Sequence, residues 1–235
     1  MSGWAPKRFW TDAVAEPCDG GFTVRLDARP VRTPLKAPMV LPTLAMAQAI
    51  AAEWQAQTGA VNPATMPCTR AANSAIDNVA RQFDAVVNML AAYGDTDLLC
   101  YRATDPDPLI ARQATVWNPL LAWAADTFGA PLNVTSGVIP VAQPTASVAI
   151  LRAEIARLTP FQLAGFHDLV AMSGSLVLAL AVIHGRLDPN EAWGLSRIDE
   201  QWQAELWGDD DEASAVAERK HRDFLQAHRF YALCR

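Results

Sequence analysis

The segment YGDTDLLCYRA, residues 93–103, holds the residue types best suited to chemistry. Asp95 and Asp97 lie two positions apart and could contribute to a divalent-cation site, although such a site needs more oxygen ligands than two carboxylates provide. Cys100, near Arg102, could act as a nucleophile, but a reactive thiol needs a neighbouring base or a positive field. The structural alternative is that Asp95 caps a helix whose Cys100 enters the core, and we favour it over a catalytic or metal site.

The other motifs and the histidines point away from a catalytic centre. No GxxxxGKS/T, GxGxxG, GxSxG or HExxH pattern occurs, which removes the usual nucleotide, hydride, serine-hydrolase and zinc-protease interpretations. His167 and Asp168 are adjacent, so on a helix their side chains diverge by about 100° and should not form a dyad with each other. The remaining histidines are interpreted as structural: His184, His221 and His228. The sequence therefore predicts no catalytic residue, no metal site and no cofactor.

Composition and charge limit the partners and the compartment. The 235 residues carry a formal net charge of −6 and no Lys/Arg-rich stretch, which argues against non-specific binding to nucleic acid. The N-terminal residues lack the basic-then-apolar order of a signal peptide. The four cysteines are widely spaced and form no CxxC pair, so we expect a reducing compartment and a cytoplasmic protein: Cys18, Cys68, Cys100 and Cys234.

One apolar run, LVAMSGSLVLALAVI at residues 169–183, raises the question of a membrane span. The run is shorter than the roughly 20 residues that a spanning helix needs, and His167 and Asp168 come directly before it. Helices that are apolar on all sides usually lie inside larger folds. We therefore expect a buried core helix and no membrane insertion.

The residue pattern changes along the chain from alternating to Ala-rich, and this change predicts an α+β protein with two domains. In GGFTVRLDARPVRTPL, residues 20–35, apolar and polar residues alternate, which predicts a half-buried strand, a short turn and a return strand from Val31. The connector VNPATMPCTR precedes a long Ala-rich and helical region. We therefore expect a small antiparallel β-containing N-terminal domain, residues 1–65, followed by a larger, mainly α-helical domain, residues 66–235.

Capping residues predict where helices begin. Thr43 should cap a helix that ends before Gly59, and TPFQ at residues 159–162 should begin a long buried helix that ends near Gly185. Asp188 should cap another helix by the same logic. Further helices are expected near residues 70–93, 108–128 and 147–158, and a last helix from the acidic run Asp209–Glu212 toward Leu233.

The stretch SRIDEQWQAELWGDDDEA, residues 196–213, combines two tryptophans with seven carboxylates. If one helix runs from Pro189 to Trp207, a stripe at spacings of three and four faces the core: Leu195, Ile198, Trp202 and Leu206. Trp193, Glu200 and Trp207 are spaced by seven and share a second face.

This second face has two explanations. The helix could be sandwiched between two layers, with Glu200 paired to Arg197 or another neighbour. Alternatively, the face could meet a partner, since Trp and Arg dominate the energetic hot spots of interfaces. The residues taken alone favour the sandwich.

Seven segments in a fixed order give the sequence a resemblance to a known family. Over nearly its full length, from KRFW at residues 7–10 onward, the chain resembles the assembly chaperones that serve the alpha subunit of the ATP synthase catalytic head in mitochondria and α-proteobacteria. The segments are RPVRTP (29–34), AAEWQAQ (51–57), MPCTRAANSAID (66–77), YGDTDLLCYRA (93–103), WNPLLAW (117–123), SGSLVLALA (173–181) and SRIDEQWQAELWG (196–208).

The resemblance implies a chaperone that does no covalent chemistry. Such proteins hold the new alpha subunit and mask a surface that the beta subunit later covers, and they need no ATP for this. The resemblance places the acidic function in the late helical motif, where we prefer Glu200 because it alone shares a face with the two tryptophans. The predicted partner-binding residues are Glu200, Trp193, Trp207, Arg197, Asp199 and Glu205.

The leading expectation is thus an ATP-independent, monomeric assembly chaperone for the alpha subunit. Two alternatives stay open. The first is an enzyme of unknown substrate that uses Cys100 with Asp95 or Asp97. The second is a helical module that binds a small molecule in an apolar pocket near residues 173–175.

Overall fold

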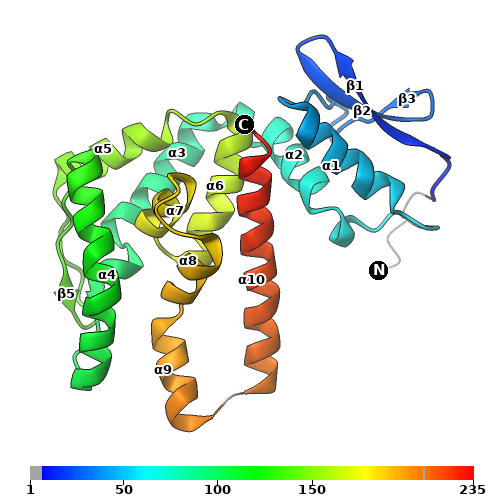
Figure 1. Cartoon of the computed structure of the whole chain (residues 1–235). Coiled ribbons are helices and arrows are strands. Elements are labelled where there is room, and N and C mark those ends of the chain that lie inside the picture. Colours follow the sequence, from blue (N-terminus) through cyan, green and yellow to red (C-terminus); the bar gives the residue numbers. More distant parts are fainter. Residues whose placement is uncertain (1–6, 209) are drawn as a thin grey trace. The chain divides into compact units, whose positions relative to one another are not determined.

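A small antiparallel sheet and a larger set of helices make up the chain, as the sequence predicts (Figure 1). The computed structural model describes residues 7–208 and 210–235, so Asp209 of the predicted acidic run lies outside the described residues. The chain divides into two compact units. The first unit contains the chain up to Phe83 together with Thr159–Gly165 and Arg229–Arg235, and the second contains Asp84–Leu158 and Phe166–His228.

These compact units and the predicted domains divide the chain at different places. The first unit continues past residue 65 and includes α2 (Pro67–Asp77), which packs beside α1 (Leu44–Gln55). Glu53 of α1 explains this packing, because its carboxylate accepts hydrogen bonds from two amides at the start of α2, at 2.7 and 2.8 Å. The division between residues 65 and 66 stays a prediction about domains that fold separately.

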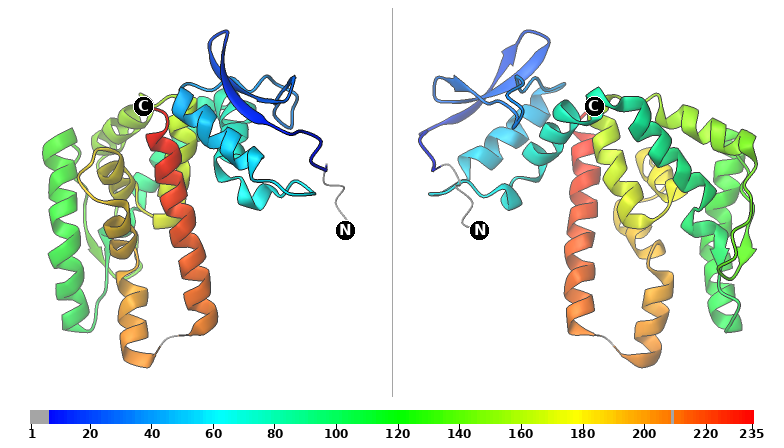
Figure 2. Two further views of the ribbon diagram at one scale, coloured as in Figure 1. Left: turned by 45° about the vertical axis from the view of Figure 1, so that its right-hand side comes forward. Right: turned by 180° about the vertical axis from the view of Figure 1, so that it is seen from behind.

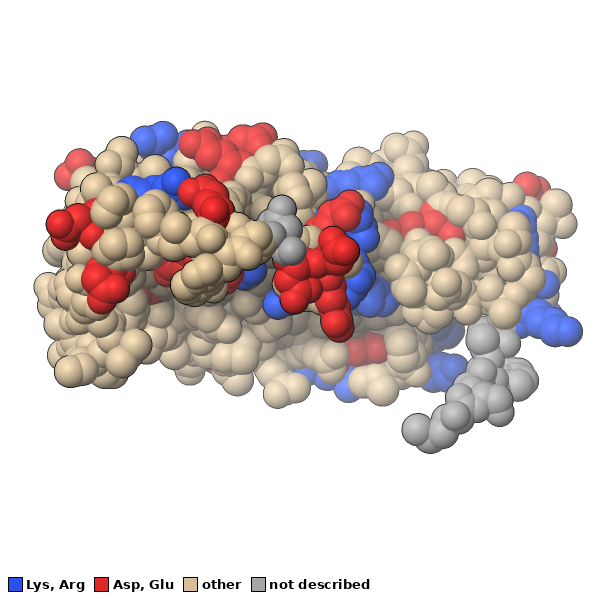
Figure 3. All heavy atoms as spheres, turned by 90° about the horizontal axis from the view of Figure 1, so that it is seen from below, with Lys and Arg blue, Asp and Glu red and all other residues tan. Residues whose placement is uncertain are grey.

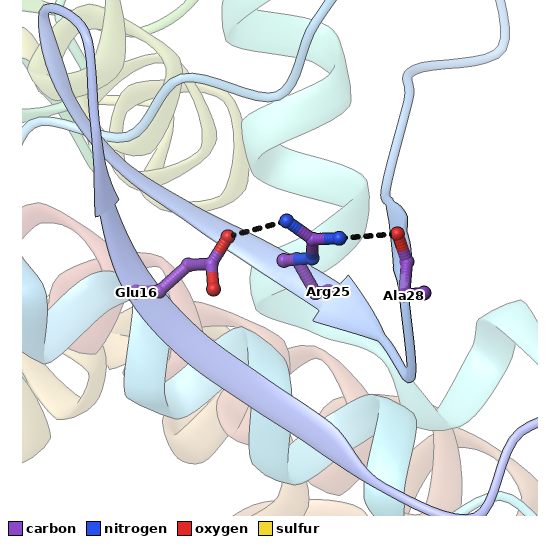
Figure 4. Close-up of polar contacts among 3 residues, drawn as sticks. All are labelled: Glu16, Arg25 and Ala28. Atoms are coloured by element: carbon purple, nitrogen blue, oxygen red, sulfur yellow. Dashed lines mark hydrogen bonds and ion pairs between the residues drawn. The ribbon is translucent and has the colours of Figure 1, made fainter.

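Three strands form the sheet of the first unit in the order β1-β2-β3: Ala13–Cys18, Gly21–Leu26 and Arg29–Pro30. β2 is the predicted strand, whereas the return strand lies at Arg29–Pro30, slightly before the predicted Val31. The guanidinium of Arg25 donates to the Glu16 carboxylate on β1, at 3.2 Å, and to the carbonyl of Ala28 in the turn (Figure 4). This side chain therefore links the two hairpins of the sheet.

Three of the helix starts predicted from capping residues are confirmed, those at Thr43, Thr159 and Asp188. The Thr43 hydroxyl accepts a hydrogen bond from the Met46 amide at 3.1 Å and begins α1. Thr159 and Gln162 form a reciprocal capping box, with distances of 2.9 and 3.3 Å. The Asp188 carboxylate likewise accepts from the amide of the second residue after it, at 2.8 Å.

The second unit is built mainly from helices, with two short strands. Its helices include α3 (Phe83–Ala91), α4 (Asp107–Phe128), α5 (Thr145–Ile155), α6 (Pro160–Ser173), α7 (Leu176–Ile183), α8 (Pro189–Leu195), α9 (Ile198–Trp207) and α10 (Asp211–Ala232), of which α3, α6 and α10 also contribute residues to the first unit. The strands β4 (Tyr101–Arg102) and β5 (Thr135–Ser136) pair in parallel. The order of these helices follows the prediction from residue 70 onward.

Two of the predicted helices in this part of the chain are wrong in length because each divides into two. The region 70–93 forms α2 and α3, and the long apolar helix expected up to Gly185 forms α6 and α7. Gly174 separates these last two with a φ of +69°, a conformation that residues with a side chain rarely adopt. No helix within residues 7–208 and 210–235 has both the length and the apolar character that crossing a bilayer requires.

Helix α7 forms the buried centre of the second unit, beside α4 and α8 (Figure 2). The fully buried carboxylate of Asp97 fixes its start by accepting hydrogen bonds from the Ser175 hydroxyl at 2.8 Å and the Val177 amide at 2.9 Å. The same carboxylate accepts from the Leu99 amide at 3.0 Å. The predicted capping role therefore belongs to Asp97, and its assignment to the exposed Asp95 is wrong.

We expect Asp97→Asn to lower the free energy of unfolding by about 1–3 kcal/mol. The amide would place an NH₂ group against N–H and O–H donors that now share two acceptor oxygens. Urea unfolding followed by circular dichroism measures the change. Asp95→Asn is the matched control, because the exposed Asp95 should change stability by less than about 0.5 kcal/mol. Equal stability of the two variants would contradict the capping role.

Candidate partner-binding site

The late motif lies on two short helices, so the prediction of one helix from Pro189 to Trp207 is wrong. α8 ends at Leu195 and α9 begins at Ile198. The Ser196 hydroxyl donates to the carbonyl of Trp193 at 2.7 Å, and Gly194 lowers the helix propensity just before it. These two residues explain the break and the new direction of α9.

Trp193 belongs to the core, which contradicts the expectation that it lies outside the main apolar stripe. It is 7% exposed, and its ring stacks on His221 of α10 at 5.7 Å between centroids and an interplanar angle of 6°. The centroid of this ring also lies 5.7 Å from that of Phe224. Trp193 thus connects α8 to α10. Trp207, at the end of α9, lies on the surface instead, with 80% of the residue exposed.

The predicted core stripe holds only in part. Ile198 is buried, but Leu206 is 57% exposed, so its assignment to the core is wrong. Trp202 is half-buried, with the Arg112 guanidinium of α4 lying 5.0 Å from its ring centroid. The side of α9 that carries Trp202 therefore faces α4, a neighbour that the sequence pattern could not supply.

Two of the predicted acidic residues also face α4. Glu205 receives two parallel hydrogen bonds from Arg112, both at 2.8 Å, and this guanidinium holds the pKa of Glu205 below its usual value. Asp199 accepts a hydrogen bond from the Gln113 side chain at 2.6 Å. The structure therefore separates Asp199 and Glu205 from Glu200, as the preference for Glu200 assumed.

A groove of about 440 Å³ lies between α9 and α10. Its lining contains the four other predicted partner-binding residues: Trp193, Arg197, Glu200 and Trp207. Glu200 lies on its α9 side, where its carboxylate contacts Arg197 at 2.6 Å. The lining consists of Trp193, Arg197, Glu200, Gln201, Gln203, Ala204, Trp207, Gly208, Asp210, Ala213, Ser214 and Ala217. The residues of α10 were missed by the sequence analysis, although α9 and α10 are consecutive helices joined by a short connection, which favours neighbouring positions.

The groove lining includes two carboxylates, Glu200 and Asp210, and several small residues. Asp210 caps α10 by accepting hydrogen bonds from the amides of Glu212 and Ala213 at 2.8 and 3.0 Å. In the view of Figure 3, acidic side chains gather beside a wide uncharged surface. An aromatic ring exposed next to carboxylates and a small-residue groove suits protein binding better than chemistry.

The region suited to chemistry is part of the core. Cys100 is buried, and desolvation together with the nearby Asp97 carboxylate raises the pKa of its thiol to about 12. Ser173 and Ser175, at the place expected for a small-molecule pocket, use their hydroxyls to bond the Leu169 carbonyl and Asp97. Within the described ranges, no group of three or more His, Cys, Asp or Glu residues could hold a metal ion.

One expectation about the histidines is wrong. His167 and Asp168 contact each other, with 2.9 Å between Nδ1 and the carboxylate oxygen, and this carboxylate raises the pKa of His167. Both side chains are partly exposed, so they bend toward each other despite their divergent directions on α6. The pair lies on a helix surface and touches none of the groove residues named above.

We expect Cys100 to be inert toward a thiol reagent in the folded protein. At pH 8 almost none of a thiol with a pKa of about 12 is ionised, and its burial excludes the reagent. Reaction with Ellman's reagent at pH 8, in a variant that retains only Cys100, measures this. Labelling should proceed only after urea is added, whereas a variant that retains only the less buried Cys18 should react without it. Rapid labelling of native Cys100 would restore the enzyme alternative.

Comparison with known proteins identifies relatives that cover most of the chain. The family model described as ATP12 chaperone protein matches residues 7–125. The crystal structure of Atp12 from Paracoccus denitrificans is 52% identical in sequence, covers 97% of this chain and 98% of its own, and superimposes with a TM-score of 0.94. A candidate chaperone from Agrobacterium tumefaciens is 41% identical over 95% of this chain and 85% of its own, with a TM-score of 0.88.

A more distant relative extends the same match. The mitochondrial protein atp12 of Schizosaccharomyces pombe is 23% identical over 244 residues, which cover 97% of this chain and 82% of that protein. The family model alone spans half of the chain, and the Paracoccus structure covers nearly all of it. The chain belongs to the ATP12 chaperone family.

Proposed function

We propose that this chain binds the unassembled alpha subunit of the ATP synthase catalytic head and prevents its aggregation until the beta subunit joins. The observation that carries the proposal is the exposed Trp207, 80% accessible, at the edge of an open groove between α9 and α10. A large aromatic side chain that the fold leaves in water is a typical anchor of an interface. Membership of a chaperone family and the resemblance of the late motif support the choice of client.

The physical state of a free subunit explains why such a protein is needed. An unassembled subunit exposes the apolar surface that its neighbour later covers, and such surfaces drive aggregation. A groove lined by an exposed aromatic ring and two carboxylates can cover part of that surface reversibly, without covalent chemistry or ATP. In this proposal the chain acts as a monomer in the bacterial cytoplasm.

Co-purification tests the client directly. The tagged chain is mixed with free alpha subunit, free beta subunit or the assembled catalytic head, and the captured protein is quantified. Capture of free alpha alone supports the proposal. If properly folded free alpha is not retained, the proposal fails.

We expect Glu200→Lys to weaken alpha binding about 10-fold without unfolding the protein. The substitution removes the carboxylate that pairs with Arg197 and reverses the charge at this position of the groove lining. Binding is measured by isothermal titration calorimetry. Glu218→Lys is the matched control, since Glu218 also pairs with an arginine, Arg222, but does not line the groove. An equal loss in both variants would show that net charge, not this position, controls binding.

Substitution of Trp207 should affect alpha binding, whereas substitution of Trp193 should affect stability. Trp207→Ala should weaken alpha binding about 10-fold or more while changing the free energy of unfolding by less than about 0.5 kcal/mol, because its ring is in water. Trp193→Ala should cost about 3–5 kcal/mol of stability, because it leaves a cavity against Phe224 and His221. Urea unfolding and calorimetry measure the two effects. A stable Trp193→Ala variant would contradict the assignment of this residue to the core.

A further inference from the structure

A loop of the second unit, Gly137–Pro140, presents two branched apolar side chains to solvent. Val138 is 91% exposed and Ile139 is 76% exposed. Among the large apolar residues that the structure describes, only Trp207 is exposed to a similar degree. The proposed function makes no use of this loop.

Hydrogen bonds fix the base of this loop. The Asn133 amide donates to the Gln143 side chain at 2.7 Å, and that side chain donates back to the Asn133 carbonyl at 2.9 Å. β5 pairs with β4 just before the loop, and the Gly137 amide donates to the Arg102 carbonyl at 2.8 Å. A loop fixed in this way presents its apolar side chains with little ordering entropy left to lose on binding.

The loop and α9 border the same cleft. Val138 lines a cavity of about 390 Å³ together with Asp199, which is the α9 residue held by Gln113. Asp105, an exposed carboxylate, lines the cleft as well. The lining of this cleft therefore combines an apolar side chain of the loop with two carboxylates.

The charges around this cleft define what it would accept. Arg102, the one basic residue of the lining, is only 7% exposed, and its guanidinium lies 5.2 Å from the ring centroid of Trp117. Its positive charge is thus directed to the core, while Asp105 and Asp199 face the cleft region. A partner segment with aliphatic side chains and a neighbouring Lys or Arg complements this pattern.

We propose that Val138 and Ile139 form a second docking point for the alpha subunit, which receives a segment that combines aliphatic side chains with a basic residue. This inference rests on the proposed function, because it assigns the loop to the same client. α9 contributes Asp199 to this cleft and Glu200 to the groove, so one client chain can contact both docking points. Each contact then raises the effective concentration for the other.

The test measures the affinity of the full chain for purified free alpha subunit by isothermal titration calorimetry. The double substitution Val138→Ser with Ile139→Ser should weaken binding about 10-fold. The matched control is Val14→Ser with Leu35→Ser in the first unit, whose side chains are 54% and 56% exposed. This control should bind as the original chain does. Thermal unfolding checks that neither double variant has lost its fold.

A second measurement does not depend on substitution effects. A photo-crosslinking amino acid at position 138 should form a covalent adduct with alpha on irradiation, and one at position 14 should not. Peptide mapping of the adduct should find a basic residue next to the crosslinked aliphatic segment. An adduct only at position 14 would overturn the inference.

The outcomes separate this inference from the proposed function. If the original chain does not bind alpha, the proposed function fails and takes the inference with it. If the original chain binds alpha and the loop variant binds equally well, only the inference fails. If the loop variant instead dissolves a homodimer seen by sedimentation and leaves alpha affinity unchanged, the loop contacts a second copy of this chain and the inference is wrong.

Discussion

The buried carboxylate of Asp97 is the interaction on which the second unit depends. A carboxylate removed from water costs several kcal/mol unless hydrogen bonds replace its hydration, and here Ser175, Val177 and Leu99 supply them. These bonds join two segments nearly eighty residues apart and fix the first turn of α7. Because α4 and α8 pack against α7, and α9 follows α8 directly, the exposed end of α9 takes its position from this buried contact.

The sequence predicts best what is decided within a few residues. The caps at Thr43, Thr159 and Asp188 are correct because each satisfies amides of its own first turn. The apolar run before Gly185 predicts a buried region but not that it forms two helices, α6 and α7. The helices separate at Gly174, and α7 starts where Ser175 bonds to Asp97, a residue distant in sequence. The two-part α+β organisation follows from the change in residue pattern along the chain. The extent of the first compact unit depends instead on hydrogen bonds that Glu53 accepts from the start of α2.

The candidate site shows the same limit. A spacing of seven places Trp193, Glu200 and Trp207 together, and all three do line one groove although the helix breaks between the first two. The spacing of residues along a helix does not show how deeply each one is buried. Trp193, predicted outside the core stripe, is therefore buried, and Leu206, predicted in the core, is exposed. How deeply each residue is buried depends on α10, the next helix in the chain, and on α4, which is far from α9 in sequence, and neither leaves a periodic signal in α9.

The pairing of charges on α9 bears on how a client could be held and later released. Glu200 pairs with Arg197, and Glu205 with Arg112, at solvent-accessible positions where ion pairs are weak. A basic side chain of the client can therefore replace Arg197 at Glu200 at small cost, and Arg197 can return when the client leaves. The bidentate pair between Glu205 and Arg112 joins α9 to α4 and keeps the helix in place during this exchange. Under the proposed function such an exchange would need no nucleotide, because the beta subunit would only have to offer the client a larger apolar surface than the groove does.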